Sequence, residues 1–444
     1  MWRAFMRRLS SITLLLLSQS LQAGVTPAPV VDLPKPDSWQ FTFQARVRGE
    51  YRDNVYDFDA AKKSVTDDSW LLHRIRLGIE WQPLDWLHVT AQGQDVRESF
   101  SDRADVPLQQ GAEGDDAFDL RLASLEFGDP KRMSFKLGRQ ILSYGDERLV
   151  GPLEWLNFSR TFDAAKLHYQ TENWWVDGFV SSVVRIHESH FNVSDFSDTQ
   201  NPRHQVFSGI YFSSSVIPVQ ATDLYALHLH EESIQGATDF VTYGSRMKGD
   251  PLKLKGWDYT LELVGQAGQL QGKDLRAYAF HLESGYNWLQ SAWKPRLGLE
   301  YSHGSGDGNA ADNKVNTFQN LFPTNHPPYG FMDTFSWQNM HNFVLRLAAQ
   351  PHAKVKTTMD LHGFWLADTA DAWYRANGTT RVRKITPGAS NYAGAEADFT
   401  VNTKLSSHLD MLVGYSHFFA GAYLHDTGAG DDADFAYLML TLNY

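Results

Sequence analysis

The residues of this 444-residue chain that could bind or transform a ligand are densest in one stretch, residues 136–167. The stretch contains three arginines and two aspartates, namely Arg139, Arg148, Arg160, Asp146 and Asp163. Arginine is planar, permanently charged and able to bind a carboxylate through two parallel hydrogen bonds. The three arginines are therefore candidates for binding anions, and the two aspartates are better interpreted as local anchors of a folded-in segment.

Catalytic chemistry finds little support in the sequence. Two Ser-His pairs, Ser302-His303 and Ser416-His417, fall within expected strands, where adjacent side chains point to opposite faces and cannot form a nucleophile–base pair. No pair of acidic residues stands out as an acid–base pair. The absence of cysteine excludes a thiolate metal site and a cysteine nucleophile. We expect no enzymatic activity, no cofactor and no bound metal.

Composition excludes several protein classes. The 14 Trp, 18 Tyr and 27 Phe residues carry too much apolar surface for a disordered chain. The mean hydropathy of −0.39 and the lack of an apolar run of 18 residues argue against a helical membrane protein. A formal net charge of −12 argues against a general nucleic-acid binder.

The N-terminus predicts export from the cytoplasm. Arg3, Arg7 and Arg8 precede a short apolar core over residues 12–17, and Ala23 stands at a suitable cleavage site. Residues 1–23 are therefore predicted to be a signal peptide, with an ordinary N-terminal helix as the alternative. Residues 24–38 form a proline-rich lead-in, and the folded part is predicted to cover 39–444.

After the predicted signal peptide, apolar and polar residues alternate along the chain with a period of two residues. From Trp39 to Tyr51 the odd positions are apolar or glycine, and the even positions are Gln, Thr, Arg or Glu. Successive side chains of a strand point to opposite faces, so such a segment has one apolar and one polar face. The pattern recurs over about 18 segments of the length that a tilted transmembrane strand needs. A soluble β-protein also alternates and remains the weaker alternative.

The connections and the C-terminus point to an outer-membrane barrel. Short Pro-, Gly- or Asp-containing turns alternate with long acidic or Gly/Asn-rich loops, which is the asymmetry of such barrels. Alternating apolar residues lead to the terminal Tyr444, and this ending resembles the strand that the barrel-assembly machinery recognises. We expect an all-β, antiparallel transmembrane barrel of about 18 strands with long extracellular loops, contacting outer-membrane lipid and located in the bacterial outer membrane. The long segment 304–340 is the candidate for a loop that folds into or over the pore.

The polar strand faces then line a lumen wide enough for water. The basic residues expected there are Arg46, Arg48, Arg74, Arg76, Arg139, Arg148, Arg160, Lys166, Arg296 and Arg346. The acidic residues expected to pair with them are Glu50, Glu80, Asp146, Asp163, Glu262, Glu300 and Asp360. For any single arginine, a role in selecting anions and a structural role in an Arg–Glu ladder are both open.

Two blocks of the sequence resemble a known family. The first contains Gly138-Arg-Gln140, Tyr144-Gly-Asp146, Arg148-Leu-Val-Gly151 and Arg160-Thr-Phe-Asp163, and the second runs from Asn320 to Asn339. Together they resemble the alginate export family of outer-membrane β-barrels. The resemblance implies an 18-stranded barrel through which an anionic polysaccharide moves, guided by a cation-lined constriction.

The sequence therefore predicts an outer-membrane channel for anionic, alginate-like poly- or oligosaccharide, with an arginine-lined lumen. The alternatives are a porin that takes up carbohydrates or organic anions, and a non-conducting structural or adhesive barrel. The expected partners are lipid, an anionic saccharide or small organic anion, and the assembly machinery through Tyr444; no nucleic-acid partner is expected.

Overall fold

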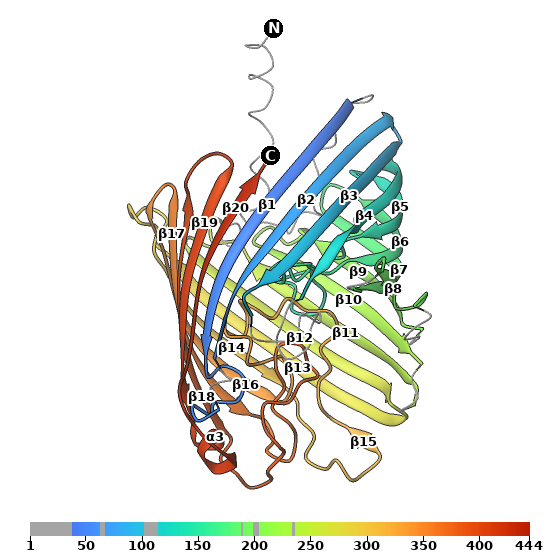
Figure 1. The fold of residues 1–444 in the computed structure, drawn as a ribbon. Helices are drawn as coiled ribbons and strands as arrows, with labels where there is room; N and C mark the ends of the chain where they lie inside the picture. The colour runs from blue at the N-terminus through green and yellow to red at the C-terminus, as the bar shows by residue number, and fades with distance from the viewer. Residues whose placement is uncertain (1–37, 63–66, 102–113, 188–189, 199–203, 233–235) are drawn as a thin grey trace.

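The computed structural model describes residues 38–444, apart from 63–66, 102–113, 188–189, 199–203 and 233–235. The predicted signal peptide 1–23 and residues 24–37 of the lead-in lie outside the described residues. Within the described part, two strands of two residues each, β8 (Val193–Ser194) and β15 (Lys314–Val315), lie in connections. The other 18 strands form a closed antiparallel barrel, which confirms the predicted fold (Figure 1).

The barrel strands follow one another around the wall in chain order. The first nine are β1 (Ser38–Asp53), β2 (Asp68–Leu84), β3 (Leu87–Ser99), β4 (Asp116–Asp129), β5 (Met133–Gln140), β6 (Phe162–Gln170), β7 (Trp174–Arg185), β9 (Val206–Ser214) and β10 (Gln220–Glu231). The second nine are β11 (Thr238–Gly249), β12 (Trp257–Leu270), β13 (Lys273–Asn287), β14 (Arg296–Gly304), β16 (Met340–His352), β17 (Val355–Leu366), β18 (Tyr392–Lys404), β19 (Leu409–Ala420) and β20 (Ala433–Asn443).

The first and last strands close the barrel. β1 pairs antiparallel with β20 from Gln44 opposite Asn443 to Asp53 opposite Asp434. The terminal Tyr444 continues this ladder, because its backbone N–H donates to the Phe43 carbonyl and its own carbonyl accepts from the Phe43 N–H, both at 2.8 Å. Every barrel strand within the described residues therefore has a hydrogen-bonded neighbour on both sides, as a sheet that spans a bilayer requires.

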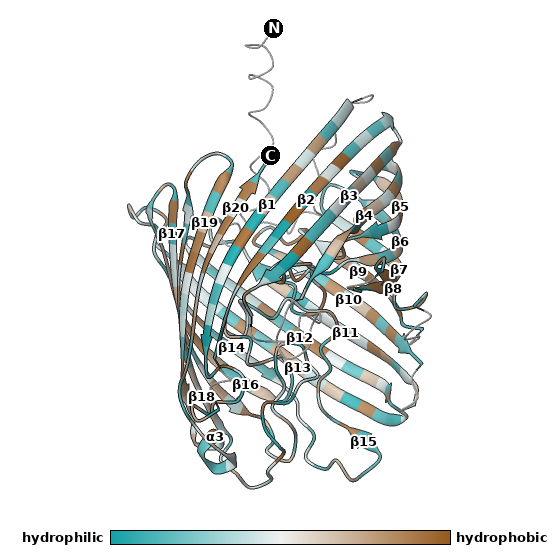
Figure 2. Cartoon of the chain, viewed as in Figure 1, coloured by the Kyte–Doolittle hydropathy of each residue, from teal (hydrophilic) through white to brown (hydrophobic). Residues whose placement is uncertain are grey.

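Alternation along each strand separates lipid from lumen. On β2, Leu77 is 52% exposed on the outer face, whereas its neighbour Arg76 is buried inside the barrel. Hydrophobic and hydrophilic residues alternate along most barrel strands (Figure 2). Near the short-turn end, the outward Trp39 and Trp81 rings stack with centroids 4.4 Å apart, as expected for an interfacial aromatic belt.

The long connections lie at one end of the barrel, and the other end has turns of two to eight residues; the two-residue turn 271–272 is a short exception at the long-connection end (Figure 1). Two long connections, residues 305–339 and 367–391, pack inward against the barrel wall. The buried ring of Phe335 stacks on Phe364 of β17 and on Trp373, and the Gln319 backbone N–H donates to Gln266 of β12 at 2.8 Å. These two connections and the inner face of the wall therefore form a hydrophobic core inside the barrel.

One short helix, α3 (Ala422–Thr427), lies in the last long connection. Among the residues that the structure describes, no helix combines the length and the apolar character needed to cross a bilayer.

The outward position of Leu77 yields a test of the strand register. Changing Leu77 to Arg places a charge in the hydrocarbon region and is expected to lower the free energy of unfolding by about 2–4 kcal/mol. Leu77→Met, which conserves volume and polarity, is the control and should cost less than about 1.5 kcal/mol. The measurement is denaturant unfolding from lipid vesicles. Equal stabilities of the two variants would place Leu77 away from lipid.

Candidate functional site

The connection between β5 and β6 lies inside the barrel. We refer to residues 141–161 as the inserted segment. Leu142, Val150, Asn157 and Phe158 are all less than 5% exposed. Gly145 allows its close approach to the wall: it has φ +60°, and a Cβ atom there would lie 3.0 Å from both the Tyr211 hydroxyl and the Arg246 guanidinium.

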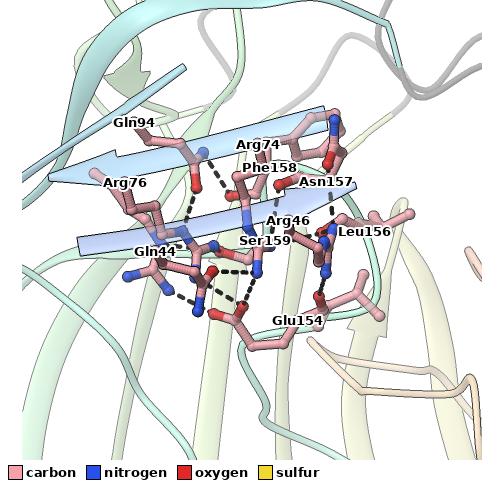
Figure 3. Close-up of polar contacts among 12 residues, drawn as sticks. Gln44, Arg46, Arg74, Arg76, Gln94, Glu154, Leu156, Asn157, Phe158 and Ser159 are labelled. Carbon is pink, nitrogen blue, oxygen red and sulfur yellow. Dashed lines mark hydrogen bonds and ion pairs between the residues drawn. The ribbon is translucent and has the colours of Figure 1, made fainter. Parts of the chain in front are cut away.

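Arginines of the barrel wall hold the backbone of the inserted segment. Arg46 donates from Nη1 to the Glu154 carbonyl at 2.7 Å, and Arg74 donates to the Asn157 carbonyl at 3.1 Å. Arg48 donates to the Trp155 carbonyl and places its guanidinium 4.0 Å from the centre of the Trp155 ring. Backbone carbonyls inside a barrel need donors, and these guanidinium groups supply them (Figure 3).

One carboxylate of the inserted segment meets three guanidinium groups. Glu154 Oε2 lies 2.9 Å from Arg76 and 3.3 Å from Arg74, and Glu154 Oε1 lies 2.6 Å from Arg121 of β4. We call Arg74, Arg76 and Arg121 the arginine cluster. Their side chains are 3–6% exposed, whereas the Glu154 side chain is 42% exposed.

The cluster carries more positive charge than its carboxylate neutralises. Arg76 also donates to the neutral oxygens of Gln94 and Ser159, at 2.7 and 2.9 Å. Arg121 likewise donates to Gln92 and to Ser159. Three cations thus share one anion.

The charge of Glu154 depends on these neighbours. Enclosure by the protein raises the pKa of the Glu154 carboxyl, and the charges of Arg76, Arg121 and Arg74 lower it. The arginines prevail and hold the pKa well below its usual range. Glu154 is therefore ionised at neutral pH.

The opposite side of the inserted segment is held by a second set of ion pairs. Arg148 lies 3.0 Å from Glu300 of β14, and Asp146 lies 2.7 Å from Lys248 of β11 and 3.4 Å from Arg246. Burial raises the pKa of Asp146, but Arg246 and Lys248 outweigh burial and hold it well below its usual range. In this geometry Arg148 and Asp146 hold the segment against the wall.

Arg160 joins the inserted segment to the long connection 305–339. Its Nη1 donates to the Gly151 carbonyl at 2.9 Å and to the Pro323 carbonyl at 3.0 Å. The Gly151 N–H donates to the Phe322 carbonyl at 2.8 Å, and the Trp155 ring stacks on His326 with centroids 3.8 Å apart. The two connections therefore form one packed body inside the barrel, with Arg160 at their junction.

Arg139 and Asp163 do not face the lumen, which corrects the expectation for both. They share the outward rows of β5 and β6 with Leu137 and Leu167, which are 49% and 47% exposed. Arg139 lies 2.8 Å from Asp163 and also donates to the carbonyls of Leu120 and Asn192. The physical reason is strand parity, since each stands an even number of residues from an outward leucine.

The remaining predicted residues lie on the inner face, mostly in ion pairs. Arg346 lies 3.0 Å from Asp360 and 3.3 Å from Glu300, and Arg296 lies 2.6 Å from Asp258. The other pairings are Arg48 with Glu50 at 2.6 Å, Lys166 with Asp177 at 3.2 Å, and Glu262 with the Tyr225 hydroxyl at 2.8 Å; Glu80 stands opposite Gln40 and Thr90. These pairs stiffen the wall and largely cancel their own charge.

Several central residues were absent from the sequence prediction. The sequence did not single out three wall residues that form ion pairs with the inserted segment, namely Arg121, Arg246 and Lys248. It also did not single out Glu154, which forms ion pairs from the inserted segment to the wall. Arg246 and Lys248 stand in one alternating row of β11, so the period-two pattern could have identified them. No sequence signal marks Glu154, because its partners come from strands 33 to 80 residues earlier in the chain.

Comparisons with known proteins agree with this architecture. The family model described as "Alginate export" matches residues 37–437. None of the curated proteins compared with the chain matches it.

Solved barrels from Pseudomonas aeruginosa are similar in fold. OccK9 (OpdG) has a TM-score of 0.63 at 13% identity, over 91% of this chain and 98% of that one. The outer membrane protein OprD has a TM-score of 0.58 at 11% identity, over 96% and 97% of the two chains. OpdK with vanillate has a TM-score of 0.57 at 11% identity, over 91% and 98%.

The junction at Arg160 yields a prediction. Arg160→Ala leaves the Gly151 and Pro323 carbonyls without their donor, which should cost about 1–3 kcal/mol and loosen the two connections. We expect larger current fluctuations in single-channel recordings from planar bilayers. Arg276→Ala is the control, because the Arg276 side chain is 75% exposed and forms its ion pair with Asp274 of the same strand. Recordings of Arg160→Ala that match the wild type would show that Arg160 does not hold the connections together.

Proposed function

Because the chain belongs to the alginate export family and is an outer-membrane channel, we propose that it conducts anionic, alginate-like poly- or oligosaccharide. Arginine side chains in the lumen make the channel selective for these anions. The observation that carries this proposal is the arginine cluster, where Arg74, Arg76 and Arg121 share the single carboxylate of Glu154. The cluster lies at the contact between the barrel wall and the inserted segment, where the Glu154 side chain is 42% exposed.

The chemistry of the cluster suits a polyuronate. Such a polymer carries about one carboxylate per sugar, and guanidinium groups bind carboxylates with defined geometry. Cationic rings in a pore favour anions, and transport requires binding that is weak enough to be released. Other lumen arginines, such as Arg296 and Arg346, are matched by acidic partners and contribute less to selectivity.

A second candidate is a porin for small organic anions. The solved barrel OpdK was determined with vanillate, and this chain is similar to it in fold. The same arginine cluster would serve a monocarboxylate, so the two candidates differ in the size of the solute. The candidate from another class, a non-conducting structural barrel, requires that the purified protein form no channels in a bilayer.

The test measures the block of ion current by added saccharide. We expect mannuronate oligomers to reduce the wild-type current, whereas neutral oligomers of equal length do so only at much higher concentration. In the double variant R76Q/R121Q, two guanidinium charges are lost, and the concentration of mannuronate oligomer that halves the current should rise about tenfold. Stronger block by free vanillate than by the oligomer would favour the organic-anion porin.

Arg276→Gln removes one charge from the outer face and is the control; its block should match the wild type. Equal block of the wild-type current by charged and neutral oligomers would contradict the proposal. So would a channel in which R76Q/R121Q leaves the block by mannuronate unchanged.

A further inference from the structure

The arginine cluster is already occupied by a carboxylate that belongs to the chain. Both oxygens of Glu154 are engaged, Oε1 by Arg121 at 2.6 Å and Oε2 by Arg76 at 2.9 Å and by Arg74 at 3.3 Å. A uronate of a passing saccharide would present the same two oxygens to the same donors. Figure 3 shows the Glu154 carboxylate among the guanidinium groups of the wall.

We propose that Glu154 is a tethered competitor for the substrate carboxylate, which occupies the arginine cluster at rest and exchanges with each uronate that passes. This inference rests on the proposed function and adds the regulation of the same site. The exchange needs no covalent step: one carboxylate leaves the guanidinium groups as another arrives.

Exposure of the side chain permits this exchange. The Glu154 side chain is 42% exposed, whereas the guanidinium-bearing side chains are 3–6% exposed. A solute therefore meets the carboxylate first and reaches the arginines only when Glu154 moves aside. The arginines themselves are held by Gln44, Gln94, Gln92 and Ser159 and would keep their positions.

The backbone around Glu154 is fixed independently of its carboxylate. Arg46, which lies outside the arginine cluster, holds the Glu154 carbonyl at 2.7 Å and the Leu156 carbonyl at 3.1 Å, and Arg48 binds the Trp155 carbonyl. The Asn157 side chain in turn donates to the His73 carbonyl at 3.1 Å. The side chain of Glu154 can therefore swing away while the inserted segment stays in place.

Competition by Glu154 would allow the channel to release each uronate that the arginine cluster binds. Three buried guanidinium groups without a counter-charge would bind a polyuronate tightly and hold it, whereas conduction requires release at every site. An internal carboxylate lowers the affinity for each uronate and restores charge balance after each one leaves.

The experiment compares E154Q with the wild type in planar bilayers. Glutamine has nearly the same shape, and its one amide oxygen can still accept from the cluster, although its amide nitrogen cannot. The bonds from Arg46 and Arg48 to the backbone should keep the segment in place while the competing charge is lost. The concentration of a mannuronate trimer that halves the current should fall about tenfold. The zero-current potential in a salt gradient should also move further toward the anion potential.

E172Q is the matched control, because Glu172 lies exposed in the turn between β6 and β7 and the substitution changes the charge equally. E154D provides a second variant that keeps the charge but shortens the reach, so its block should lie between wild type and E154Q. Heat-dependent migration in gels checks that each barrel is folded.

One outcome would overturn the competitor role alone: mannuronate blocks the wild-type current, and the block in E154Q and E154D is the same or weaker. The proposed function would still stand. Wild-type current blocked equally by mannuronate and neutral trimers would overturn the proposed function itself.

Discussion

The structure depends on hydrogen-bond and ion-pair partners for the charged side chains that are buried inside the barrel. A guanidinium group that loses contact with water must find hydrogen-bond acceptors, because an unpaired buried charge is very costly. Arg46, Arg48 and Arg74 on the inner wall find theirs in the backbone of residues 141–161. That requirement brings the inserted segment into the lumen, and Arg160 then links it to residues 305–339. The first strands thus supply the arginines that hold the inserted segment inside the barrel.

The same interaction explains how a net acidic protein can hold the locally cationic site that we propose. The chain carries a formal charge of −12, and arginines such as Arg296 and Arg346 each lie within ion-pair distance of two or more carboxylates. The arginine cluster departs from that pattern because three guanidinium groups share Glu154. Local imbalance at this one place, rather than overall charge, is what we propose gives the channel its preference for anions.

Much of the fold could be predicted from the sequence, because strand alternation is local. The row from Trp39 to Tyr51 and the ending at Tyr444 indicated a closed barrel, and the inner positions of Arg46 and Arg76 followed from the same period. The predicted lumen position of Arg139 was wrong, because Arg139 stands two residues from the outward Leu137 and shares its face of β5. The position of Glu154 could not be predicted, since it depends on how an irregular segment packs against strands distant in sequence.

The zero-current potential of the wild-type channel under a salt gradient at neutral pH tests the central claim most directly, because it reports the sign of the charge that passing ions meet. The account predicts a potential displaced toward the equilibrium potential of chloride. A potential displaced toward that of potassium would contradict it, since three arginines sharing one carboxylate could not then govern the path of ions.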